Sequence, residues 1–167
     1  MKKDNSEFKS IKIFYDILTE NERIDFLDRC KPLLRKYTTF SGLQTKNDIH
    51  KLSKENLNIV EKIRKKSKIN ASIQKSWMNY TDSEHAYEAW HDHDNPESWN
   101  YTACYMLDNP ESLGTWFKCD EDVYKPKCPT NSLLVFSKSL LHTVPPDVTL
   151  PRYTLAIDFV PVIFEYV

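Results

Sequence analysis

The chain has 167 residues, 40% of them hydrophobic, which is enough for one domain with a buried core. A net charge of −1 argues against a broad nucleic-acid-binding surface, because such a surface needs an excess of basic residues. The apolar runs fall short of the ~20 residues that span a bilayer, and the first lysines are not followed by the apolar stretch of a secretory signal, so we expect a cytoplasmic protein without a membrane partner.

Cysteine and glycine usage argues against two further kinds of site. The four cysteines accompany no export signal and lack zinc-ligand spacing, so we expect reduced thiols. They are Cys30, Cys104, Cys119 and Cys128. The only glycines, Gly42 and Gly114, do not form the Gly-rich loops that bind nucleotide phosphates, so nucleotide binding by such loops is not expected.

The first helix is predicted after a possible strand at Ile11–Tyr15. Thr19 and Glu22 have the spacing of a capping box, which marks the start of the helix. Pro32 is expected to kink or end it, because proline lacks the N–H that a helix interior needs. Its predicted apolar face consists of Ile24, Leu27, Cys30 and Leu34.

A second helix is predicted from Ser53 to about Ser67, with charged residues opposite an apolar stripe. The stripe consists of Leu57, Ile59, Val60 and Ile63. His50, before this helix, and His85, after it, belong to no partner pattern, so we expect both at the surface or in loops.

From Asn70 onwards the sequence changes to short segments rich in aromatic and β-branched residues. Helices followed by many short strands predict an α+β fold, in which the helices support a β-sandwich or barrel. We expect one domain over residues 1–167, with helical support at 1–69 and the β-core at 70–167. The predicted strands are Ser72–Tyr80, Tyr87–His91, Tyr101–Leu107, Thr115–Phe117, Ser132–Phe136, His142–Val144 and Arg152–Val160.

Two histidines, His91 and His93, stand two residues apart just before Asp94. Residues i and i+2 of a strand point to the same side, so both imidazoles can face one metal ion such as iron, copper, zinc or nickel. Taken alone, the pair is equally compatible with two surface histidines at the end of a strand.

The last predicted strand has two contrasting faces, because apolar residues alternate with polar or small ones. One face comprises Tyr153, Leu155, Ile157 and Phe159, and the other comprises Arg152, Thr154, Ala156 and Asp158. A cation that faces into a sandwich needs an anion. A guanidinium with a hydroxyl nearby, as in Arg152 and Thr154, suits a carboxylate.

The order His91, His93, His142 and Arg152 resembles the pattern of the iron(II)/2-oxoglutarate-dependent oxygenase superfamily. That pattern is His-x-Asp/Glu, a distal His and then an Arg or Lys. The segments YTACYMLDNPESLGTWF, YKPKCPTNSLLVFSKSLLHTVPP and RYTLAIDF are similar to strands and turns of the same family. The Trp-Met-Asn-Tyr stretch ahead of the His pair is similar to small members, phage-encoded ones among them. The resemblance covers Asn70 to Phe159.

This resemblance implies a double-stranded β-helix (jelly roll) with N-terminal supporting helices. It also implies a dioxygenase that uses iron(II), 2-oxoglutarate and O₂ on a primary substrate that the sequence does not identify, with hydroxylation as the default outcome. Carried over by position, His91, His93 and His142 are the catalytic metal ligands. Arg152 would bind the C5 carboxylate of 2-oxoglutarate, assisted by Thr154.

Two positions depart from the family pattern. His93 stands where the family has Asp or Glu, and Asp94 is its neighbour. A register that uses Asp94 as the ligand puts Asp92 at the first-ligand position, so we prefer His93. Asp94 stays open as an alternative ligand or as the partner of an imidazole. Asn131 replaces the usual Gly before a strand, which is a mild change because Asn tolerates left-handed backbone.

Two other functions stay open at the level of sequence. A cupin-like three-histidine metalloenzyme without 2-oxoglutarate would share the histidines but would not need Arg152. A β-helix binding module without catalytic activity would account for the missing carboxylate ligand.

Overall fold

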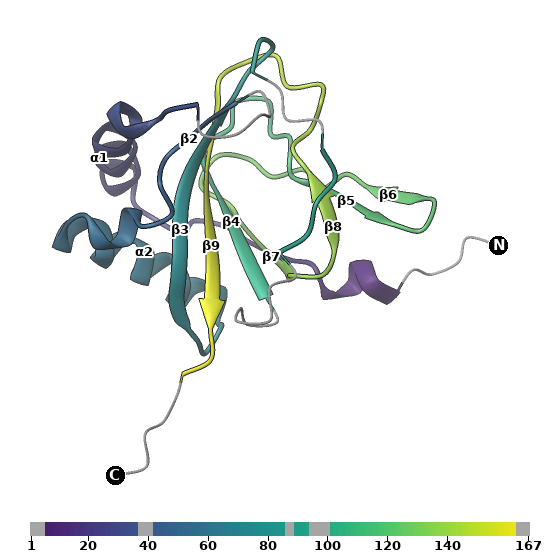
Figure 1. The fold of residues 1–167 in the computed structure, drawn as a ribbon, viewed down its shortest axis with the longest axis horizontal. Coiled ribbons are helices and arrows are strands. Elements are labelled where there is room, and N and C mark those ends of the chain that lie inside the picture. Colours follow the sequence, from purple (N-terminus) through teal and green to yellow (C-terminus); the bar gives the residue numbers. More distant parts are fainter. Residues whose placement is uncertain (1–5, 37–41, 86–88, 94–100, 163–167) are drawn as a thin grey trace.

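The computed structural model describes residues 6–36, 42–85, 89–93 and 101–162 (Figure 1). Two antiparallel sheets form the body of the protein. The helices α1 (Glu20–Cys30) and α2 (Lys54–Ser67) lie beside the larger sheet, on the side away from the smaller one. Helices that cover one outer face of a two-sheet β structure agree with the predicted α+β class.

The larger sheet has the strand order β1–β7–β4–β9–β3–β2, and the smaller sheet has the order β6–β5–β8. Neighbouring strands run antiparallel throughout. The strands are β1 (Lys12–Phe14), β2 (Leu43–Gln44), β3 (Ser72–Thr81), β4 (Tyr101–Asp108), β5 (Trp116–Cys119), β6 (Asp122–Tyr124), β7 (Leu133–Ser137), β8 (Leu141–Thr143) and β9 (Arg152–Val160). Short 3₁₀ helices occupy Ser6–Ser10, Lys31–Leu33 and Ile49–Lys51.

Most predicted strands are present with ends shifted by two residues or fewer, and β9 has the predicted bounds. The predicted strand at Tyr87–His91 is wrong for its described part. His91 forms only an isolated bridge to His142, and no strand includes residues 89 and 90, whereas 86–88 lie outside the described residues. Strand β6 escapes prediction because all its residues are exposed, so it has no alternation of buried and exposed positions.

Helix α1 begins where the capping box predicts. The Glu22 N–H donates to the Thr19 hydroxyl over 3.4 Å, and the Thr19 N–H donates to the Glu22 carboxylate over 2.9 Å. The helix ends at Cys30, directly before the 3₁₀ turn that contains Pro32. The side chain of Ser53 caps α2 in the same way, by accepting from the Asn56 N–H.

The buried faces of both helices differ from the predicted apolar stripes. Ile24 and Leu57 are each 41% exposed, so placing them on core-facing stripes is wrong. In α1, Arg23 is buried instead, and its guanidinium donates to a backbone carbonyl of β4 over 2.6 Å. In α2, Asn56 is buried, and its amide donates to a backbone carbonyl of the preceding 3₁₀ helix. Polar side chains whose hydrogen bonds are satisfied therefore occupy buried positions on both helices, where the hydrophobic periodicity predicts only apolar residues.

His50 also lies elsewhere than predicted. It is buried rather than at the surface, and its Nδ1 lies 2.7 Å from the Ser76 hydroxyl of β3. Burial lowers the pKa of His50, which favours the neutral ring. The contact fastens a 3₁₀ helix to the larger sheet, so His50 has a structural role.

Strand β9 lies between β3 and β4, near the middle of the larger sheet. Leu155, Ile157 and Phe159 are fully buried and belong to the core cluster that also contains Phe26 of α1 and Val60 of α2. The alternate residues of β9 line a cavity on the other side of the sheet. The predicted contrast between the two faces of this strand is confirmed.

Asn131 connects the N-terminal segment to the sheet. Its φ of 67° is in the left-handed region, as expected for a position where a glycine is usual. Its side chain accepts from the Leu18 N–H (3.0 Å) and the Tyr105 hydroxyl (2.7 Å), and donates to the Leu18 carbonyl (2.9 Å). Asn131 thus combines tolerance of the turn with hydrogen bonds that glycine cannot make.

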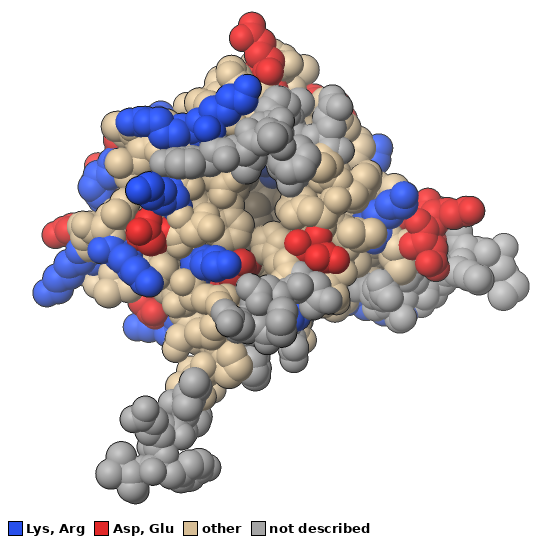
Figure 2. Space-filling model, in the orientation of Figure 1, with Lys and Arg blue, Asp and Glu red and all other residues tan. Residues whose placement is uncertain are grey.

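None of the helices in residues 6–36, 42–85, 89–93 and 101–162 is long and apolar enough to cross a membrane. None of the four cysteines, all of which lie within the described residues, is joined in a disulfide. Figure 2 shows basic and acidic side chains interspersed on one face of the molecule, as the net charge of −1 leads one to expect.

Candidate functional site

A cavity of about 440 Å³ opens between the two sheets, and Figure 2 shows the molecule hollowed near its centre. The walls come from β3, β4 and β9 of the larger sheet, from β8 of the smaller sheet, and from residues 91–93. The cavity therefore collects side chains that are distant in sequence, which is typical of a ligand site in a β-sandwich.

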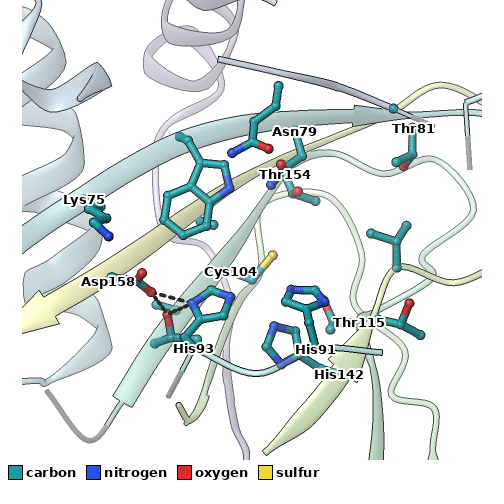
Figure 3. Close-up of a pocket in the computed structure, with 18 of the residues that line it drawn as sticks. Lys75, Asn79, Thr81, His91, His93, Cys104, Thr115, His142, Thr154 and Asp158 are labelled. Atoms are coloured by element: carbon teal, nitrogen blue, oxygen red, sulfur yellow. Dashed lines mark hydrogen bonds and ion pairs between the residues drawn. The ribbon is translucent and has the colours of Figure 1, made fainter. Parts of the chain in front are cut away.

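Three histidines meet on one wall of this cavity (Figure 3). One ring nitrogen from each of His91, His93 and His142 lies within 4.8 Å of the others, a separation that suits ligands of a single metal ion. The backbones of His91 and His142 exchange two hydrogen bonds of 3.0 and 2.8 Å, which places residue 91 beside β8. His93 reaches the same point because it is two residues further along the extended chain.

Backbone carbonyls orient two of the rings. The Nδ1 of His91 lies 3.2 Å from the Ala89 carbonyl, and the Nδ1 of His142 lies 2.8 Å from the Leu140 carbonyl. A carbonyl only accepts, so each Nδ1 carries the proton and each Nε2 keeps the lone pair that a metal needs. Burial lowers the pKa of His91, and burial together with the two neighbouring histidines lowers the pKa of His142 to about 3. Both rings are therefore neutral at physiological pH, which is the ligating form.

A carboxylate orients the third ring. The Nδ1 of His93 lies 2.7 Å from Oδ1 of Asp158 on β9. The Thr102 hydroxyl of β4 donates to the same carboxylate. The ring centroid of Trp77 lies 5.6 Å from that of His93, so the imidazole is held from two sides. Asp94, the alternative ligand, lies outside the described residues.

Arg152 lies on the β9 wall of the same cavity and is only 2% exposed. Its Nε donates to the Leu113 carbonyl over 3.2 Å, and one terminal nitrogen lies 3.6 Å from the Met106 sulfur. Among the described residues no carboxylate pairs with it. Burial lowers the pKa of Arg152, yet a guanidinium stays protonated in proteins, so this charge calls for an anion from outside the chain.

Two hydroxyls accompany Arg152. Thr81 is its partner across the β3–β9 register, and the Thr81 hydroxyl is buried without a hydrogen-bond partner in the described part of the chain. Thr154 is also buried and lines the cavity, two residues further along β9. A buried cation beside an unpartnered hydroxyl fits a carboxylate, which accepts from both.

The structure brings together every site residue that the sequence suggests within the described residues. The three histidines form one cluster, and Arg152 and Thr154 line the cavity that contains it. Their roles toward a metal or cosubstrate stay predictions. Sequence reasoning missed Thr81, whose place opposite Arg152 depends on strand register. It put Asp158 on the polar face of β9 but gave it no role.

Neither a protein-family model nor a curated protein matches this sequence. Solved structures do match over almost the whole chain. A prolyl hydroxylase from Trichoplax adhaerens, in complex with a hypoxia inducible factor peptide, has a TM-score of 0.69 at 14% identity, covering 93% of this chain and 86% of that chain. HygX from Streptomyces hygroscopicus, with nickel and 2-oxoglutarate bound, has a TM-score of 0.70 at 10% identity, covering 94% and 85%.

The α-ketoglutarate-dependent carbocyclase SnoK from nogalamycin biosynthesis has a TM-score of 0.72 at 9% identity, covering 93% of this chain and 82% of that chain. Identities this low establish the fold and leave the activity open. The neighbours confirm the predicted double-stranded β-helix with supporting helices. The chain has the fold of the iron(II)/2-oxoglutarate oxygenases.

Proposed function

We propose that this protein is an iron(II)- and 2-oxoglutarate-dependent dioxygenase, with hydroxylation of its primary substrate as the default reaction. The observation that carries the proposal is the buried Arg152, which has no carboxylate partner among the described residues and shares a cavity with three histidines. A cluster of metal-ligating histidines alone would suit many enzymes. Such a cluster in one cavity with a buried guanidinium that lacks a described carboxylate partner suits a ligand that chelates the metal at one end and carries a carboxylate at the other.

His91, His93 and His142 would hold the iron. Their nitrogens are close enough for one ion, and the orientation of His91 and His142 is fixed by main-chain carbonyls. Imidazole is a good ligand for iron(II), and three ligands on one side leave coordination positions for cosubstrate and oxygen. When bound, iron supplies oxygen activation, so that 2-oxoglutarate, O₂ and a substrate C–H give succinate, CO₂ and the hydroxylated substrate.

Arg152, Thr154 and Thr81 would hold the far carboxylate of 2-oxoglutarate. The guanidinium keeps N–H donors beyond those used on Leu113 and Met106, and the Thr81 hydroxyl has no described partner. Charge-assisted hydrogen bonds in a buried pocket are strong, and they fix the orientation of the bound acid. The chain thus contributes anchoring, orientation and exclusion of water.

The two rival functions predict different responses to ligands. A cupin-like three-histidine enzyme would bind metal without any effect of 2-oxoglutarate, and an inactive binding module would respond to neither. Arg152 favours the oxygenase over the cupin-like enzyme and the binding module. A buried charge without a partner destabilises the fold, and neither rival function gives Arg152 an anion to bind.

Thermal unfolding with Mn(II), a redox-stable substitute for iron(II), separates these functions. We expect Mn(II) to raise Tm, and 2-oxoglutarate at about 100 times its Kd to raise it by a further 5–10 °C, roughly, only when Mn(II) is present. Glutarate, which lacks the keto oxygen that chelates, is the matched control and should give a smaller rise. A rise with Mn(II) but none with 2-oxoglutarate would favour the cupin-like enzyme, and no rise with either would favour the binding module.

A further inference from the structure

The most unusual feature of the histidine cluster is the carboxylate behind His93. We propose that Asp158 is a positioning residue of the metal centre, which orients His93 and supplies from β9 the negative charge that related enzymes place on the ligand itself. The inference rests on the proposed function, since it assigns a role toward the metal that the histidines would hold.

The contact between the two side chains is short and protected. The His93 Nδ1 and the Asp158 Oδ1 are 2.7 Å apart, and the side chains are 13% and 11% exposed. Figure 3 shows the imidazole between this carboxylate and the other two histidines. The Nδ1–H therefore donates to Asp158 and leaves Nε2 for the metal, the tautomer that His91 and His142 also adopt.

The carboxylate is itself held in place. Thr102 lies opposite Asp158 in the β4–β9 register, and its hydroxyl donates to Asp158. The same hydroxyl lies 3.1 Å from the Ile157 carbonyl and 3.3 Å from the His93 Nδ1. Two neighbouring strands of the larger sheet thus fix an acceptor at the point where the His93 ring needs one.

Asp158 has few charged neighbours in the described part of the chain that could compensate its own charge. Within the described ranges, His93 is the one charged or chargeable group within 4.0 Å of its carboxylate. Lys75 faces it across the β3–β9 register without forming an ion pair. A buried carboxylate is unfavourable unless a cation compensates it, and a metal ion on the far side of His93 would do so through the ring.

A charge count explains why this chain would need the arrangement. Iron(II) with two histidines and one ligating carboxylate carries a net charge of +1, whereas three neutral histidines leave +2. Adding the Asp158 carboxylate to the His93 site returns the total to +1 (−1 added to +2). A carboxylate that accepts from a ligating histidine also makes the ring a stronger donor to the metal than a carbonyl does.

The test compares metal binding by the full chain and by Asp158→Asn (D158N), with Co(II) as a spectroscopic probe and Fe(II) under anaerobic conditions. Asparagine has the same shape and can still accept from Nδ1, so the variant removes the charge and keeps the orientation. We expect the Kd for both metals to rise about 10–100-fold and the Co(II) visible spectrum to shift. D122N is the control, because Asp122 of β6 is exposed and lies outside the cavity lining, so its Kd should change less than threefold, roughly, as for a screened surface charge.

A second pair of variants tests the exchange of charge. H93D places a carboxylate at the position where related enzymes have one, but it leaves Asp158 buried beside a like charge, so we expect weak metal binding. H93D/D158N removes that repulsion and should bind metal at least about tenfold more tightly than H93D. The double variant also carries the test if D158N alone fails to fold, which far-UV circular dichroism will show.

The outcomes separate this inference from the proposed function. If wild-type protein binds metal and D158N binds it equally well, with H93D and D158N additive, the role of Asp158 is refuted and the proposed function stands. If wild-type protein binds no metal, both are refuted. A loss in D158N that H93D/D158N reverses supports the role of Asp158 and the metal site on which the proposed function depends.

Discussion

The two faces of β9 share one backbone and serve opposite purposes. Leu155, Ile157 and Phe159 point toward the helices and are fully buried in apolar surroundings. Arg152 and Asp158 are also buried, but they point into the cavity and carry charge. Stability comes from the first face, and the second is tolerable only if a ligand compensates its charges. Burial to the same extent can therefore stabilise the fold at one residue and destabilise it at the next.

The largest effect is expected from damage to the core face. Leu155→Ala leaves a cavity among fully packed neighbours, so we expect a loss of about 2–5 kcal/mol in the free energy of unfolding. Urea denaturation measures it, and 2-oxoglutarate affinity measured on the folded variant should stay near the wild-type value. A loss below about 1 kcal/mol would mean that this face contributes less than its burial suggests.

The opposite result is expected on the cavity face. Arg152→Met keeps the volume and removes a buried charge that lacks a described partner, so the free protein should be as stable as wild type or more stable. Its affinity for 2-oxoglutarate should fall about 30–100-fold, equivalent to roughly 2–3 kcal/mol of charge-assisted hydrogen bonding. Thermal melts with and without Mn(II) and 2-oxoglutarate measure both quantities.

Lys75→Met is the matched control for Arg152. Lys75 also lines the cavity, but it lies opposite Asp158 in the β3–β9 register. Thr81, which lies opposite Arg152, is six residues further along β3. Its loss should leave 2-oxoglutarate affinity unchanged. A drop in the free-protein stability of R152M, with 2-oxoglutarate binding intact, would make Arg152 a structural residue.

A smaller effect is expected at Thr81, whose buried hydroxyl has no partner among the described residues. Thr81→Val should weaken 2-oxoglutarate binding about 5-fold, because one neutral hydrogen bond is worth about 1 kcal/mol. The free protein should lose no stability, since an unsatisfied polar atom disappears. Thr81→Ser keeps the hydroxyl and should bind 2-oxoglutarate as tightly as wild type. If the Val and Ser variants bind 2-oxoglutarate with equal affinity, the Thr81 hydroxyl does not contact its carboxylate.

The smallest effect is expected in the supporting helices, where a substitution should leave both faces of β9 unchanged. A hydrogen bond from Lys62, together with one from the Thr19 N–H, lowers the pKa of Glu22 to about 2. Because the folded pKa lies below the unfolded one, the stabilisation is present above the unfolded pKa of about 4.5 and is lost as pH falls toward 2. Glu22→Gln should lower stability at neutral pH by about 0.5 kcal/mol, since the pair is partly exposed, and should flatten the acid side of the stability profile. If the stability of the variant falls with pH as steeply as that of wild type, the acid sensitivity comes from other carboxylates.

The sequence predicts features that depend on neighbouring residues. The Thr19 capping box, the alternation along β9 and the two-residue spacing of His91 and His93 all need only local geometry. Features that depend on long-range register escaped prediction. Thr81 meets Arg152, and Asp158 meets His93, only once the strands are paired.

The buried faces of the helices escaped for a related reason. Arg23 and Asn56 are polar, and only the carbonyls that they meet in the folded protein make their burial favourable. Residue type alone assigns such positions to solvent, so the sequence predicts apolar stripes that include Ile24 and Leu57 instead. The same reasoning placed His50 at the surface, although Ser76 satisfies it in the interior.

An anaerobic titration tests the central claim most directly. Iron(II)-loaded protein receives 2-oxoglutarate while its visible absorption is recorded. We predict a weak charge-transfer band that grows with added 2-oxoglutarate, saturates at an equimolar ratio, and is absent from His142→Ala. Iron-loaded wild-type protein that shows no band at saturating 2-oxoglutarate would contradict the assignment of this cavity to iron(II) and 2-oxoglutarate.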